Sequence, residues 1–188
     1  MNKVDENFIK QGIYLDDIKQ EYFIVKNLCD KAKELIFMYN RNIDSTCSFL
    51  DYFYFNDDIL KLSPIEQILE IAFMIYDFYI GSVNGIFTER KLQKEIYVNN
   101  KKYIADFYLD FIVKDMDICK LKKPLIIECD GFEYHANKKQ VNYDYERETN
   151  LKLQGYDIIR FTGTQIYNEP LECVEKICNY LQNAELGD

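Results

Sequence analysis

The sequence lacks tryptophan and contains one histidine, three prolines and seven glycines among its 188 residues. Its six cysteines are scattered without a Cys-x-x-Cys spacing, so together with the single histidine they give no support to a Cys/His zinc site. Scattered cysteines of this kind are typical of reduced thiols. We therefore predict a cytoplasmic protein.

An excess of basic residues is also absent. The chain has 23 Lys and Arg against 32 Asp and Glu, a net charge of −9, which is the opposite of what is usual for a nucleic-acid binder. The most apolar stretch, residues 71–88, is interrupted by Asp77 and two glycines, and residues 1–12 contain no signal-like apolar core. We predict neither a membrane span nor a secretory signal.

Apolar and aromatic residues are abundant instead. Hydrophobic residues make up 48% of the chain, and 16 Tyr and 13 Phe bring the aromatic share to 15%. This composition excludes a disordered chain and predicts a packed core. The length suits one domain with a small appendage.

A long amphipathic helix is predicted over residues 16–40. Its apolar positions recur at intervals of three and four: Ile18, Tyr22, Val25, Cys29, Ala32, Ile36 and Tyr39. This face would pack on its own domain or pair with another helix, so a protein partner or self-association through it stays open. We assign residues 1–56 to a helical N-terminal extension and 57–188 to the main domain.

A second helix should begin at the segment Ser-Pro-Ile-Glu, residues 63–66. Ser63 is suited to cap the helix, and Glu66, three residues later, closes a capping box. We expect this helix to run to about Ile80 and to stop at Gly81.

The remaining pattern predicts strands followed by helices. The predicted elements are a hairpin of strands 94–98 and 103–113 turning at Asn99-Asn100, a strand 125–130 opened by Pro124, a polar helix 137–154, a strand 156–161, and an amphipathic helix carrying Leu171, Val174, Ile177, Cys178 and Leu181. In the second strand, Tyr103, Ala105, Phe107, Leu109, Phe111 and Val113 share the face expected in the core. Strand, helix and strand at the end of this order predict a parallel βαβ unit.

Three acidic residues stand in apolar strands. Asp106 lies mid-strand, and Glu128 and Asp130 end the strand Pro-Leu-Ile-Ile, with both side chains on one side. Burying carboxylates is costly unless they bind something, and Mg²⁺ or Mn²⁺ prefers oxygen ligands. Each acid would otherwise cap a loop or pair with Lys or Arg.

The order of these motifs resembles the PD-(D/E)xK nuclease superfamily, the restriction-endonuclease-like fold. The resemblance covers about residues 63–168 and is carried by Ile-Ala-Asp-Phe at 104–107, Ile-Ile-Glu-Cys-Asp-Gly at 126–131, His135, Asp144, Arg147, Leu151, Gly155 and Tyr-Asp-Ile-Ile-Arg-Phe at 156–161. Within the superfamily these motifs resemble the branch of very-short-patch mismatch-repair endonucleases. The resemblance implies an α/β fold with an αβββαβα core, whose central mixed sheet is flanked by helices.

The resemblance also implies roles for these residues. Asp106 and Glu128 would bind the metal, Glu66 would complete the acidic shell, and His135 would act as a catalytic histidine. At the position of the superfamily's usual lysine, two residues after the strand glutamate, this sequence has Asp130. The implied activity is metal-dependent endonuclease cleavage of DNA, in repair, restriction, defence or a mobile element.

Basic residues that would contact DNA lie near these motifs. They are Lys91, Lys94, Lys101, Lys102, Lys120, Lys122, Lys123, Lys138 and Lys139, of which Lys102, Lys138 and Lys139 are the main candidates. Arg147 would bind a phosphate or pair with Asp144, one helical turn away. The alternative function is a non-catalytic nuclease-fold module that binds a protein partner or nucleic acid.

Overall fold

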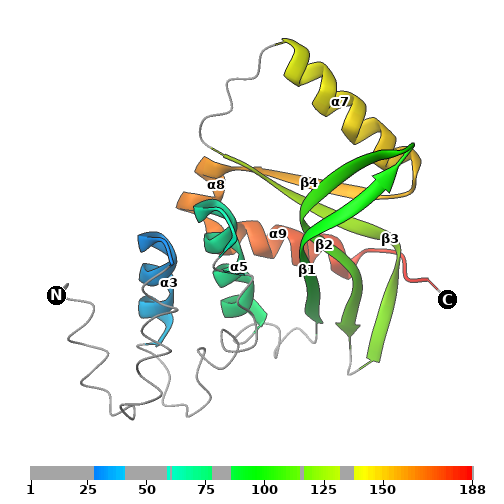
Figure 1. Ribbon diagram of the computed structural model, residues 1–188. Helices are drawn as coiled ribbons and strands as arrows, with labels where there is room; N and C mark the ends of the chain where they lie inside the picture. Colours follow the sequence, from blue (N-terminus) through cyan, green and yellow to red (C-terminus); the bar gives the residue numbers. More distant parts are fainter. Residues whose placement is uncertain are drawn as a thin grey trace.

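The computed structural model describes residues 28–40, 59, 61–77, 86–114, 117–131 and 138–187. Its elements are α3 (Asp30–Asn40), α5 (Pro64–Tyr76), β1 (Ile86–Val98), β2 (Lys101–Lys114), β3 (Asp117–Asp130), α7 (Lys138–Leu153), β4 (Asp157–Thr162), α8 (Gly163–Asn168) and α9 (Pro170–Gln182) (Figure 1). Among the described residues, no helix combines the length and apolarity that crossing a membrane requires.

The centre of the fold is a four-stranded mixed sheet in the order β1-β2-β3-β4. β1 and β2 are antiparallel, as are β2 and β3, while β3 and β4 are parallel. Helices α5 and α9 pack on one face, and α7 covers part of the other through Leu151 (Figure 1). This arrangement confirms the predicted α/β fold with helices flanking a mixed sheet.

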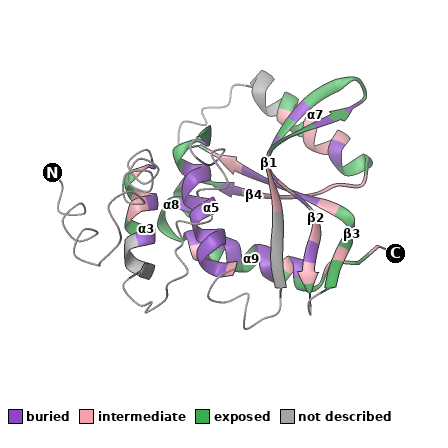
Figure 2. Cartoon of the chain, turned by 60° about the horizontal axis from the view of Figure 1, so that its bottom comes forward, coloured by how far each residue is buried: buried purple, intermediate pink, exposed green. Residues whose placement is uncertain are grey.

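Helix α5 begins as the sequence predicts. The Ser63 hydroxyl accepts from the Glu66 N–H at 3.4 Å, and the Glu66 carboxylate accepts from the Ser63 N–H at 2.7 Å, so the capping box is complete. Almost the whole helix is buried, which makes it the centre of the larger core (Figure 2). The predicted end at Ile80 lies outside the described residues.

The predicted helix over residues 16–40 is wrong at its centre. Leu28 forms a bend and α3 begins at Asp30, while the Cys29 N–H donates to the Gln67 side chain of α5 at 2.9 Å. Cys29 therefore precedes α3, and its amide is bonded to α5. Residues 16–27 lie outside the described part. Four residues, Leu28, Ala32, Leu35 and Ile36, are buried in the core with α5.

The hairpin turn is confirmed, but β1, β2 and β3 all start earlier than predicted. Asn99 and Asn100 have φ of 51° and 61°, the left-handed pair that a two-residue hairpin turn requires. β1 already begins at Ile86, and β3 begins at Asp117 because pairing with β2 continues on both sides of an irregularity. Pro124 lies within that irregularity, where a residue without an N–H is tolerated.

The predicted core face of β2 holds as far as Leu109. Tyr103, Ala105, Phe107 and Leu109 are buried, but Phe111 and Val113 are only partly buried and Ile112 is buried instead. The prediction for Phe111 and Val113 is wrong because the irregularity after Leu109 shifts the alternation by one residue. The buried face also divides: Tyr103 and Ala105 pack beneath α7, while Phe107 and Leu109 pack against the larger core.

The C-terminal half follows the predicted order and adds one helix. Gly155, with φ of 88°, supplies the left-handed residue between α7 and β4. The added helix, α8, has its own capping box between Thr162 and Gln165. The sequence Thr-x-x-Gln carries this signal, so α8 was open to prediction. Helix α9 buries four of its five predicted apolar positions, and the fifth, Leu171, is partly buried. The five cysteines in the described residues are free thiols.

Candidate active site

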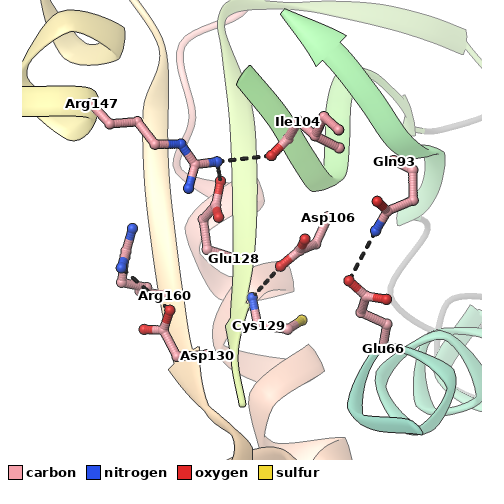
Figure 3. Close-up of polar contacts among 9 residues, drawn as sticks. All are labelled: Glu66, Gln93, Ile104, Asp106, Glu128, Cys129, Asp130, Arg147 and Arg160. Atoms are coloured by element: carbon pink, nitrogen blue, oxygen red, sulfur yellow. Dashed lines mark hydrogen bonds and ion pairs between the residues drawn. The ribbon is translucent and has the colours of Figure 1, made fainter. Parts of the chain in front are cut away.

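Asp106 lies where β2 and β3 separate. The last backbone pair of the two strands on this side joins Phe107 with Ile127. Beyond it, the Asp106 carboxylate accepts the backbone N–H of Cys129 at 2.7 Å, so a side chain replaces the main-chain acceptor of the neighbouring strand (Figure 3). This bond brings Asp106 close to Glu128, the residue before Cys129.

The separation of β2 from β3 at Asp106 lies opposite an irregularity in β1. Gln93 has a φ of 49° and stands between the paired residues Leu92 and Lys94, opposite Asp106. Its side-chain amide donates to Glu66 Oε1 at 2.9 Å (Figure 3). At the left-handed backbone of Gln93 the hairpin changes the core that it packs against. Leu92 packs against the larger core with α5, and Ile96 packs in the smaller core beneath α7.

Glu66 is brought to the site by α5. Its side chain is buried, with Oε1 on Gln93 and Oε2 on the Ser63 N–H. A buried ion pair holds α5 against β1 nearby: Arg90 donates to both oxygens of Glu70 at 2.8 and 2.9 Å. Glu66 is therefore fixed in place beside Asp106, with both oxygens already accepting hydrogen bonds.

The electrostatics of Asp106 reflect this crowding. Burial raises the pKa of its carboxyl to about 7, against the opposing effect of the Cys129 N–H. The negative charges of Glu128 and Glu66 raise the pKa further. In the absence of a cation, the site thus disfavours ionisation of Asp106.

Glu128 is held by an arginine from α7. Arg147 Nη2 lies 2.6 Å from Glu128 Oε1 and also donates to the Ile104 carbonyl at 2.8 Å. Burial raises the pKa of Glu128, and Arg147 opposes that rise. The sequence pointed to a phosphate or Asp144 as the partner of Arg147; the structure gives it Glu128.

Asp130 points to the same side of β3 as Glu128 and contacts Arg160. Arg160 Nη1 lies 3.3 Å from Asp130 Oδ1. Arg160 is also the register partner of Glu128, because β3 and β4 pair in parallel from Leu125 with Asp157 onward. Arg160 is not among the site residues predicted from the sequence, although the predicted parallel pairing of its strand with residues 125–130 indicated that it lies near Glu128.

Comparison with known proteins identifies the family. Residues 88–181, half of the chain, match the family model described as REase_MTES_1575, a restriction-endonuclease-like family. The chain belongs to this family. An "Uncharacterized protein" of Haemophilus influenzae is 36% identical over 67 residues, which are 36% of this chain and 37% of that relative. The chain thus matches little more than a third of the relative's length. No solved structure gives a significant match.

Membership of the restriction-endonuclease-like REase_MTES_1575 family agrees with the mixed sheet and its acidic strand ends. The structure brings four predicted site residues, Glu66, Asp106, Glu128 and Asp130, to one region (Figure 3).

Residues 132–137, with His135, lie outside the described part, as do the side chains of Lys138 and Lys139. The predicted lysines Lys91, Lys101, Lys102 and Lys122 pair with Asp110, Glu146, Glu95 and Glu185.

Across the described part of the chain, no three side chains of Asp, Glu, His or Cys are grouped as ligands of one metal ion. A magnesium ion needs fewer, because it keeps several waters and is commonly held by one or two carboxylates and a substrate phosphate. Asp106 and Glu128 offer two such carboxylates. The pKa of Asp106 is raised mainly by burial and further by the charges of Glu128 and Glu66, which a cation would offset. The donor set therefore fits a hard divalent cation, with Glu128 Oε1 shared with Arg147.

Proposed function

We propose that the protein is a metal-dependent endonuclease that hydrolyses DNA phosphodiester bonds. The observation that carries this proposal is the position of Asp106 where β2 and β3 separate, beside Glu128 within a restriction-endonuclease-like fold. Carboxylates on neighbouring strands are the oxygen ligands that a hard cation and a bound phosphate would use.

Each acidic residue has a separate part in this proposal. Asp106 and Glu128 would hold Mg²⁺ or Mn²⁺, which when bound offsets charge on the phosphate and lowers the pKa of water. Glu66, held by Ser63 and Gln93, adds negative charge beside Asp106 and strengthens attraction for the cation. Asp130 follows Glu128 on the same side of β3 and would orient the attacking water.

His135 would take the proton of that water or donate to the phosphate. It follows β3 closely, and imidazole titrates in the useful range. We further propose that the protein belongs with the branch that resembles very-short-patch-repair endonucleases. The histidine after Glu-Cys-Asp-Gly supports this placement.

A second candidate function is a non-catalytic nuclease-fold module that binds a protein or nucleic acid. The observation in its favour is that Glu128 and Asp130 each contact an arginine, so both acids have partners within the protein. A module of this kind would use the acids to join α7 and β4 to β3. Its predicted partner surface includes the amphipathic N-terminal segment.

Cleavage assays with the full chain distinguish the two functions. Plasmid and single-stranded DNA are incubated with Mg²⁺, Mn²⁺ or EDTA, using wild type, Asp106→Ala and Glu128→Ala. Asp110→Ala is the matched control, since Asp110 lies on the same strand and pairs with Lys91 at 2.8 Å. Cleavage that needs metal, survives in the control and disappears in the two variants supports the nuclease. Equal cleavage by Asp106→Ala overturns the site, and no cleavage by wild type together with no thermal response to either metal supports the module.

A further inference from the structure

Two arginines contact the acids that end β3, and they are held differently. Arg147 has three contacts: Glu128 at 2.6 Å, the Ile104 carbonyl at 2.8 Å and the ring of Tyr103 at 5.8 Å. Arg160 contacts Asp130 through Nη1 at 3.3 Å. Both side chains of this pair are about a quarter exposed, 28% for Arg160 and 26% for Asp130. Arg147 is therefore anchored, whereas Arg160 is loosely held.

Arg160 also carries an unsatisfied donor. Among the described residues, its Nε is the buried side-chain nitrogen without a hydrogen-bond partner. A buried donor that lacks an acceptor is unfavourable, and native structures keep few of them. The observed position of the guanidinium is thus one that a better acceptor would displace.

The place of Arg160 in the sheet decides which acceptor this would be. Arg160 is the register partner of Glu128 in β4, so it stands beside the strand end that carries Glu128 and Asp130 (Figure 3). A phosphate held at this strand end would lie close to the guanidinium. The planar fork of an arginine suits two oxygens of one phosphate.

We propose that Arg160 is a substrate-contacting residue, whose guanidinium leaves Asp130 and donates to a phosphate oxygen of the bound DNA. This inference rests on the proposed nuclease function. It assigns different tasks to the two arginines: Arg147 positions Glu128 and joins α7 to the sheet, while Arg160 contacts substrate. It also places a cation from β4 beside Asp130, the position at which the resembling superfamily usually has lysine.

The first test is equilibrium binding of a short labelled DNA duplex in Ca²⁺ over a series of salt concentrations. Arg160→Gln should bind about tenfold more weakly and reduce the salt dependence by about one released counterion. Arg160→Lys, which keeps the charge but loses the fork, should fall between it and wild type. Lys176→Gln is the matched control, because it removes one positive charge from α9, on the opposite face of the sheet.

A structural role for the Asp130–Arg160 pair makes a different prediction. If the pair only held β3 and β4 together, Asp130→Asn and Arg160→Gln would weaken DNA binding alike. Under our proposal Asp130→Asn releases Arg160, so DNA binding is retained or strengthened while Arg160→Gln weakens it. Thermal melting confirms that each variant is folded.

Single-turnover cleavage separates failure of this proposal from failure of the nuclease function. If wild type cleaves and folded Arg160→Gln matches it in rate, affinity and salt dependence, the role of Arg160 is overturned and the nuclease stands. If wild type neither cleaves nor binds DNA with any divalent cation, the nuclease function itself is overturned. A slower, weaker-binding Arg160→Gln beside an unchanged Lys176→Gln supports the proposal.

Discussion

The Asp106 carboxylate accepts the backbone N–H of Cys129 at 2.7 Å, and this bond joins β2 to β3 beyond their last backbone pair. Cys129 directly follows Glu128, and Glu128 and Glu66 are the acids whose charges act on Asp106. The same hydrogen bond favours the ionised carboxylate, while burial and the neighbouring charges disfavour it. One contact thus favours the charged form of Asp106, and its surroundings favour the neutral form.

Replacing Asp106 with asparagine should stabilise the metal-free protein at pH 8 and remove most of its response to Mg²⁺. The asparagine side-chain oxygen can still accept the Cys129 N–H, but the repulsion from Glu128 and Glu66 is gone. In wild type, Mg²⁺ at a hundredfold excess over Kd should add about 2.7 kcal/mol. Thermal melts with EDTA and with Mg²⁺ measure both effects, and equal metal-induced shifts in the two proteins would contradict the prediction.

Stability of the metal-free protein should depend on the protonation of Asp106. The pKa of its carboxyl is raised in the folded state to about 7, so the native protein binds this proton more tightly than the unfolded chain. The resulting stabilisation is fully present below about pH 4 and is lost as the pH rises through 7. Urea unfolding at pH 5 and pH 8 in EDTA should show this loss in wild type and a smaller one in Asp106→Asn. The same loss in both proteins would count against the assignment.

Replacing Arg147 with leucine should destabilise the fold by about 3 kcal/mol, because it leaves the buried carboxylate of Glu128 without its partner. A second change, Glu128→Gln, should recover part of this loss by removing the buried charge. The free energy of unfolding in urea, measured for both single variants and the pair, provides the test. A single Arg147→Leu variant as stable as wild type would show that the contact contributes nothing.

Replacing His135 with alanine should lower the cleavage rate by about 10²- to 10⁴-fold while leaving Mg²⁺ binding intact. The reason is that this chain has one histidine and Asp130 in place of a lysine, so the proton of the attacking water needs another group. Lys138→Ala and Lys139→Ala are the matched comparisons, because their loss removes a cation without a titration near neutrality. Single-turnover rates across pH distinguish the three, and full activity of His135→Ala would give the role to a lysine or to metal-bound water.

A protein consisting of residues 57–188 should fold with reduced stability. The αβββαβα order starts at the Ser63 capping box, but Leu28 and three residues of α3 are buried in the core with α5. Burial of each of the Leu and Ile side chains among them is worth about 1.5–3 kcal/mol. A cooperative melt at a lower temperature than the full chain is the expected result. Absence of a cooperative melt would show that α3 belongs to the main domain, contrary to the predicted boundary.

The sequence alone was sufficient for most of the fold. The capping box at Ser63 set the start of α5, the asparagine pair set the hairpin turn, and Gly155 set the end of α7, because each depends on a few neighbouring residues. The alternation in β3 also placed Glu128 and Asp130 on one side. These features are local, and local sequence determines them.

Tertiary structure decided the partners of those residues. The hydrogen bond that takes Cys29 out of the predicted helix comes from α5, and the shift of the buried face after Leu109 depends on how β3 pairs with β2. The contacts of Glu128 with Arg147 and of Asp130 with Arg160 join β3 to α7 and β4. The preference of a residue for strand or helix depends on its neighbours in sequence. The charged side chain with which it pairs depends on which distant elements pack beside it.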